Sequence, residues 1–131
     1  MSRERDRVSG WFQLHVGLTF VSAATLAELQ FGVSRLRLRG GTRQATALAG
    51  WVDTVTTTYR NRTLDIGMDV GLRTGEMLAR AEKAGFDPGF VDACIAATAD
   101  VHGFEVVTFN ARDFAAFGVP HRRPVAEGTR P

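Results

Sequence analysis

Three short runs of β-forming residues alternate with longer segments of helical spacing, and this alternation limits the folds open to the chain. The runs are residues 19–21, 62–66 and 105–108. A longer segment with apolar residues at helical spacing, or with a helix-start signal, follows each of them. Strands of about four residues separated by helices are typical of βα units and a parallel sheet. The sequence therefore predicts an α/β fold.

The helices are predicted from the spacing of apolar residues and from start and stop signals. Ser22 occupies an N-cap position, Gly40 and Gly41 close the helix that follows, and Asp87-Pro88 is typical of a helix start. The predicted helices are residues 4–15, 23–39, 43–56, 68–84 and 90–102, with a last short helix that Asn110 caps and that runs to Phe117. The residues predicted to be buried are Leu26, Leu29, Val33, Trp51, Ile95, Val106 and Val107.

Length and composition indicate one globular domain. The chain has 131 residues, of which 44% are hydrophobic, so it can bury a single core. We predict one domain over residues 1–120 and a flexible tail over residues 121–131, which are polar and rich in Arg and Pro. No apolar run reaches the roughly 18 residues of a membrane span, so no membrane association is expected. The single cysteine, Cys94, fits a reducing cytoplasm.

The net charge of +2 is too small to indicate nucleic-acid binding on its own. Three acidic residues, however, follow predicted strands or begin the next helices: Glu28, Asp92 and Asp113. Sites in parallel sheets gather at these places. If the three carboxylates converge within about 10 Å, a hard divalent cation such as Mg²⁺ or Mn²⁺ would relieve their repulsion. A metal held this way suits the hydrolysis of a phosphodiester.

Each acidic residue also has a structural interpretation. Asp92 lies in the first turns of a helix, where a negative charge interacts favourably with the helix dipole. Asn110 and Asp113 have the spacing of a capping box, and Glu28 could be a solvated helix residue. Spacing alone does not make the three one site.

Three segments, taken together, resemble a known family. The segments VSAATLAELQFGV (21–33), DACIAATA (92–99) and VTFNARDF (107–114) are similar to the second, third and fourth motifs of PIN-domain toxins of the VapC type. Their order and spacing also match, and the resemblance covers roughly residues 7–120.

The resemblance implies a PIN-like three-layer fold, with a short parallel sheet flanked by helices. It implies a Mg²⁺-dependent endoribonuclease, with Mn²⁺ as the alternative metal, that is the toxin of a type II toxin–antitoxin pair in the cytoplasm. Glu28, Asp92 and Asp113 would hold or orient the metal and its water, with Asn110 and Thr108 in support. RNA would be the substrate, and a cognate antitoxin and a second copy of the chain would be partners.

One family feature has no counterpart here: an apolar first strand that ends in Asp and lies in the middle of the sheet. We therefore expect a gap or groove beside Phe20-Val21 and Val106-Val107, or an N-terminal segment drawn in to fill it. The family function is the leading hypothesis. The alternative is a catalytically inactive PIN-like domain that binds an antitoxin or a sister toxin.

Overall fold

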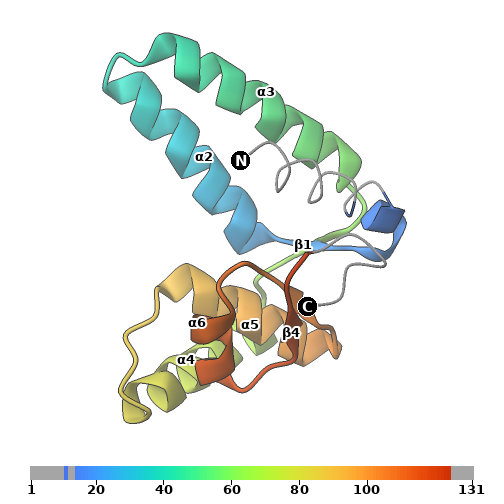
Figure 1. The fold of residues 1–131 in the computed structure, drawn as a ribbon, viewed down its shortest axis with the longest axis vertical. Coiled ribbons are helices and arrows are strands. Elements are labelled where there is room, and N and C mark those ends of the chain that lie inside the picture. The colour runs from blue at the N-terminus through green and yellow to red at the C-terminus, as the bar shows by residue number, and fades with distance from the viewer. Residues whose placement is uncertain (1–10, 12–13, 125–131) are drawn as a thin grey trace.

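The fold consists of a helical hairpin above a second layer of helices, with short strands where the two meet (Figure 1). The computed structural model describes Trp11 and residues 14–124. In chain order the elements are η1 (Val16–Leu18), β1 (Val21–Ser22), α2 (Ala23–Leu38), α3 (Thr42–Thr58), β2 (Thr63–Leu64), α4 (Met68–Lys83), α5 (Phe90–His102), β3 (Val106–Val107), α6 (Ala111–Phe117) and β4 (His121–Arg122). This order confirms the α/β class.

The hairpin of α2 and α3 begins and turns where the sequence predicts. The side chain of Ser22 caps α2 by accepting a hydrogen bond from the amide of Ala24, at 3.1 Å. Gly40, with φ of +83°, makes the turn into α3, a conformation that costs glycine little. A Cβ built on Gly32 would lie 3.3 Å from Leu48, so the missing side chain allows α2 and α3 to pack closely.

The second layer, which we call the body, contains the main hydrophobic core. Alanines on α5 are fully buried at positions 93, 96 and 97, which brings α4 against α5. The short helix α6 covers the same core with Phe114 and Phe117, whose rings meet edge to face. All the members of this core cluster come from residues 70–119. The core of the body is therefore built from one continuous stretch of chain.

The strands form two separate parallel pairs. In one pair Val21 lies opposite Thr63 in β2, and in the other Val106 lies opposite His121 in β4. Among the described residues no ladder joins β1 to β3. The described strands thus leave β1 and β3 unpaired with each other, at the position where a gap or an inserted N-terminal segment is expected.

Burial follows the prediction except at Trp51. Val33 and Val106 are buried, and Leu26, Leu29, Ile95 and Val107 are partly buried. Trp51 is 53% exposed, so its assignment to the core was wrong. Within the described part of the chain α3 packs chiefly on α2, and this contact leaves about half of the Trp51 side chain exposed.

The predicted bounds of 90–102 match α5, with Gly89 rather than Asp87 in the N-cap position, whereas the predicted tail needs correction. His121 and Arg122, placed in the flexible tail, form β4: the amide of Val106 donates to Pro120 O at 2.9 Å. The predicted helix over residues 4–15 falls largely outside the described residues, as does the tail after residue 124.

None of the helices in the described part of the chain combines the length and the apolar character that crossing a bilayer requires.

Candidate active site

Asp92 lies in the first turn of α5, at the boundary between the body and the hairpin. Gly89 provides no side-chain cap there, and a negative charge in the first turn, such as that of Asp92, interacts favourably with the helix dipole. Partial burial raises the pKa of the Asp92 carboxyl above its ordinary value of 3.8, and the neighbouring charge of Asp113 raises it further. The Asp92–Asp113 pair therefore favours the binding of a proton or a cation, which reduces the repulsion between the two carboxylates.

Asp113 is held by the turn that follows β3. The amide of Asn110 donates to Thr108 Oγ1 at 2.9 Å, and Asn110 Nδ2 donates to Asp113 Oδ2 at 2.7 Å. Asn110 occupies the N-cap position of α6 but makes no side-chain cap bond, so the capping-box interpretation was wrong in that respect. Its amide group instead fixes one carboxylate oxygen of Asp113. Thr108 and Asn110 thus orient the carboxylate of Asp113.

Glu28 approaches the same region from the hairpin. It is an exposed residue on α2, and with Asp92 and Thr108 it lines a cavity of about 1580 Å³ between the hairpin and the body. The structure thus brings Asp92 and Asp113 into electrostatic contact and places Glu28 on the wall of the cavity that Asp92 also lines.

The donor set suits a hydrated divalent cation better than a fully enclosed one. Within Trp11 and residues 14–124, no three His, Cys, Asp or Glu side chains gather closely enough to hold a metal ion among themselves. Mg²⁺ and Mn²⁺ are commonly bound by one or two carboxylates and keep several waters. Asp92 and Asp113, whose repulsion a cation would relieve, fit that pattern.

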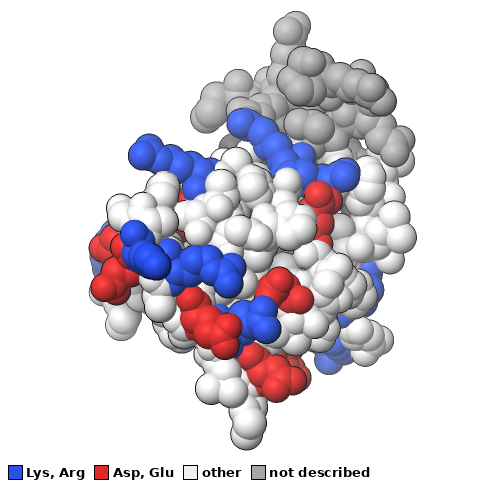
Figure 2. Space-filling model, turned by 90° about the horizontal axis from the view of Figure 1, so that it is seen from below, with Lys and Arg blue, Asp and Glu red and all other residues white. Residues whose placement is uncertain are grey.

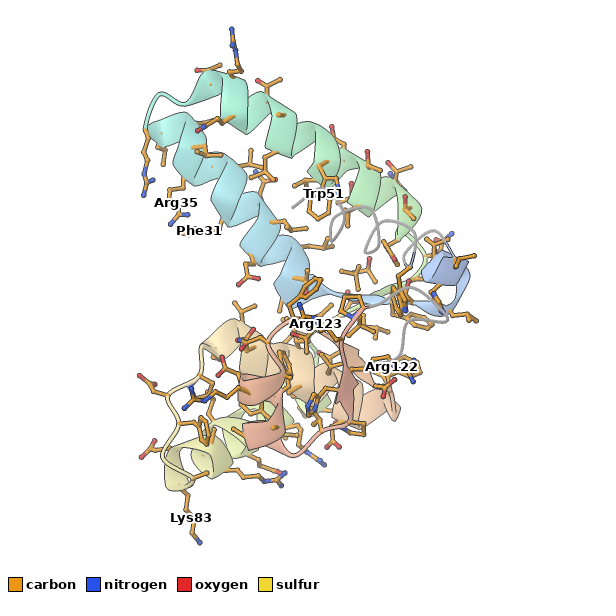
Figure 3. The ribbon with its side chains drawn as sticks, in the orientation of Figure 1. Phe31, Arg35, Trp51, Lys83, Arg122 and Arg123 are labelled. Carbon is orange, nitrogen blue, oxygen red and sulfur yellow. The ribbon has the colours of Figure 1, made fainter. Side chains whose placement is uncertain are left out.

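Basic and aromatic residues near the same cavity were missed at the sequence level. Arg122 Nε lies 2.6 Å from Glu105 Oε1, and the Arg123 guanidinium lies 5.2 Å from the centroid of the Phe109 ring. Arg122 is the second residue of β4 and Arg123 follows it directly; both are labelled in Figure 3. They were assigned to the tail because their Pro-rich surroundings lacked any strand signal. Elsewhere charge is mixed: acidic and basic side chains alternate over the face in Figure 2.

The raised pKa of Asp92 predicts a pH-dependent effect of Asp92→Asn on stability. Because folding favours the protonated carboxyl, Asp92 supports the fold most at low pH and loses that contribution as the pH rises through its folded-state pKa. The neutral variant should therefore gain in Tm relative to the parent chain between about pH 4 and pH 7. Thermal unfolding in EDTA buffers over this range tests the prediction, and a Tm difference that does not change with pH would contradict it.

Asp113→Asn should lower the pKa of Asp92 in a carboxyl NMR titration, because it removes the neighbouring negative charge.

Comparisons with known proteins show the family to which the chain belongs. The PIN domain family matches residues 2–119. VapC ribonuclease Y4jK of Sinorhizobium fredii is 32% identical over 118 residues, which are 88% of this chain and 83% of that protein. The crystal structure of DNA-bound VapBC from Salmonella typhimurium superposes with a TM-score of 0.71 at 25% identity, over 92% of this chain and 82% of that one. FitAcB from Neisseria gonorrhoeae gives a TM-score of 0.70 at 27% identity, over 83% and 77%. This chain belongs to the PIN-domain family and is a homologue of the VapC ribonucleases.

Proposed function

We propose that the chain is a metal-dependent endoribonuclease, the toxin component of a type II toxin–antitoxin pair that acts in the cytoplasm. The observation that carries the proposal is the Asp92–Asp113 pair, in which Asp92 lines a large cavity and has its pKa raised by burial and by its neighbour. The chain's homology to VapC ribonucleases supports RNA as the substrate.

Asp92 and Asp113 would hold the metal, and Glu28 would orient its water from across the cavity. Mg²⁺ is the proposed ion and Mn²⁺ the alternative, because both prefer oxygen ligands and share phosphate oxygens. When bound, such a cation lowers the pKa of water and neutralises charge at a phosphoryl centre. The protein itself orients the carboxylates. Asn110 keeps Asp113 in one orientation, and Thr108 fixes the backbone that carries Asn110.

The proposed partners are an antitoxin and a second copy of this chain. The solved relatives VapBC and FitAcB are two-component complexes by their descriptions. Apolar side chains stand exposed on the hairpin: Phe31 at 61%, Leu38 at 89% and Trp51 at 53%. Figure 3 shows Phe31 and Arg35 on the side of α2 away from α3, where the Arg35 guanidinium lies 5.2 Å from the Phe31 ring centroid. This apolar surface would suit either partner.

A second function is favoured by the broken sheet. A PIN-like domain that is catalytically inactive and only binds an antitoxin or a sister toxin would not need three converging carboxylates. The described residues contain no such three-residue cluster, and β1 and β3 are not joined.

Cleavage of RNA by the purified chain separates the two functions. We expect single-stranded RNA to be cut in the presence of Mg²⁺ or Mn²⁺ and to remain intact in excess EDTA. Without a cation, the two carboxylates would only repel the negative phosphate. Restoring the metal should restore cleavage. Intact RNA at every metal concentration, from a chain that circular dichroism shows to be folded, would favour the inactive binding domain.

A further inference from the structure

More negative than positive side chains line the cavity between the hairpin and the body. The described lining residues include the carboxylates of Glu28, Asp92 and Glu105 but only one Lys or Arg, which is Arg122. A metal ion held by Asp92 and Asp113 would neutralise only the phosphate that it binds. The other phosphates of an RNA strand in this cavity would be repelled by the carboxylates unless a positive side chain faces them. Arg122 is the lining residue with the charge for this task.

Arg122 is fixed in place and still has donors to offer. The amide of Thr108 donates to Arg122 O at 2.9 Å, which holds the backbone of Arg122 beside β3. Its Nε lies 2.6 Å from Glu105 Oε1, and its side chain is 59% exposed. The pair with Glu105 engages Nε, whereas the two Nη groups of a guanidinium carry four further N–H donors. Such donors match the oxygens of a phosphate.

The same strand pairing brings an aromatic ring beside the next arginine. Phe109 follows Thr108, Arg123 follows Arg122, and the Arg123 guanidinium lies over the Phe109 ring, 5.2 Å from its centroid. Phe109 lines the cavity and is 53% exposed. Aromatic rings and guanidinium planes are the surfaces on which proteins stack the bases of single-stranded RNA. Phe109 with Arg123 therefore has the chemistry of a base-stacking position.

A short turn connects Phe109 to the acidic pair. Residues 109 and 113 are so close in sequence that their Cα atoms lie at most about 14 Å apart. Between them, the amide of Asn110 donates to Thr108 Oγ1, and Asn110 Nδ2 donates to Asp113 Oδ2. This turn fixes the carboxylate and the backbone next to the ring together. A base on Phe109 and a phosphate near Asp113 would then belong to neighbouring parts of one strand.

We propose that Phe109 is a base-stacking residue of the RNA site and that Arg122 binds a phosphate of the same strand. The proposal rests on the proposed function, because it takes RNA as the ligand. The base stacks on the face of Phe109 opposite Arg123, and Arg122 binds a phosphate other than the one at the metal. The site selects single-stranded RNA, because the bases of a duplex are already stacked on one another.

Photocrosslinking of RNA to the whole chain in EDTA tests the stacking. The probe is a single-stranded RNA of about eight 5-iodouridines, whose base bonds to a stacked aromatic ring on irradiation. Mass spectrometry should find the crosslink at Phe109. Phe31 is the internal comparison, because it is 61% exposed and lies under the Arg35 guanidinium, also 5.2 Å away, but is not among the described residues that line the cavity.

Two outcomes of this crosslinking would overturn the proposal. Equal yields at Phe31 and Phe109 would show a general affinity of RNA for arginine–phenylalanine pairs. Both terminal segments of the chain are present in the experiment. A Phe109 ring that residues of this chain itself cover would therefore give no crosslink, and that result would also overturn the proposal.

The affinity of variants for a fluorescent oligouridine of the same length, measured by anisotropy in EDTA, tests the role of the ring. Phe109→Leu should weaken binding at least about fivefold, whereas Phe109→Trp should stay within about twofold of the parent chain. Phe90→Leu is the control: this ring is 65% exposed and is not among the described lining residues, so its loss should change the affinity less than about twofold. Equal losses in Phe109→Leu and Phe109→Trp would overturn the stacking role.

The salt dependence of the same binding tests the phosphate contact. Arg122→Gln should weaken binding and reduce the slope of log affinity against log salt concentration by about 0.7, the value for one phosphate of a single strand. Glu105→Gln keeps an acceptor for Arg122 Nε and removes a negative charge, so RNA affinity should not fall. Equal losses in both variants would mean that the ion pair only holds β4 to β3, and would overturn the role of Arg122.

Failure of this site and failure of the proposed nuclease give different results. A crosslink at Phe109 in EDTA, without cleavage once metal is added, would support the RNA site and contradict the nuclease. Metal-dependent cleavage by a chain whose Phe109 and Arg122 variants bind RNA as tightly as the parent would support the nuclease and contradict this site.

Discussion

Asp92→Asn is expected to reduce metal-dependent RNA cleavage by about a hundredfold or more, the largest effect on activity that a single substitution should have in this chain. Even residues that only support a metal ligand typically change affinity or activity by 10–100-fold, and Asp92 would bind the ion directly. Asparagine keeps the size of the side chain but removes the charge that a cation requires. Initial rates on a labelled single-stranded RNA, over a series of Mg²⁺ concentrations, measure the effect.

Asp69→Asn is the matched control for this substitution. Asp69 also lies in the first turn of a helix, α4, but it is exposed and lies outside the cavity. Its replacement should leave the rate within about twofold of the parent chain. Equal losses in both variants would trace the effect to general helix electrostatics and would remove Asp92 from the site.

Phe117→Ala is expected to lower the free energy of unfolding by about 3–5 kcal/mol, the largest single effect on stability. Phe117 is completely buried on α6, where its ring contacts that of Phe114. The main-chain carbonyl of Phe117 also accepts a hydrogen bond from Arg80 on α4, at 3.2 Å. Truncation would leave a cavity between α6 and α4 that the surrounding helices could fill only in part. Urea unfolding followed by circular dichroism gives the difference.

Phe90→Ala removes the same number of atoms from a surface position. Phe90 is 65% exposed at the first residue of α5, so its loss should cost less than about 1 kcal/mol. If the two variants were equally destabilised, residues 70–119 would not form the main core.

The helices could be predicted from the sequence because their signals are local. Ser22 caps α2 as its position indicates, and the predicted bounds of 90–102 match α5. Exposure of Trp51 could not be predicted in this way. An apolar stripe shows which side of a helix avoids water, but not whether a neighbouring layer exists to cover it. Among the described residues, α2 is the main packing partner of α3, and about half of the Trp51 side chain stays exposed.

The sequence predicted which residues belong to the candidate site better than it predicted the contacts between them. Strand ends indicated Asp92 and Asp113, and the structure brings these two together. The Asn110–Asp113 hydrogen bond was not predicted, because the same spacing fits a capping box equally well and only the rotamer distinguishes them. Arg122 was missed because β4 has two residues and pairs with a strand about fifteen positions earlier. Long-range pairing of this kind leaves no periodic signal.

The continuous core of the body has a consequence for synthesis on the ribosome. Translation delivers the hairpin first, yet the main core cluster comes from residues 70–119. The hairpin can form early from its local contacts, whereas the body must wait for Phe114 and Phe117, close to the end of the described chain. Asp113 arrives with them. A nascent chain therefore lacks both its main core and its acidic pair until residues 113–117 have left the ribosome, so the candidate site and the main core become complete in the same step.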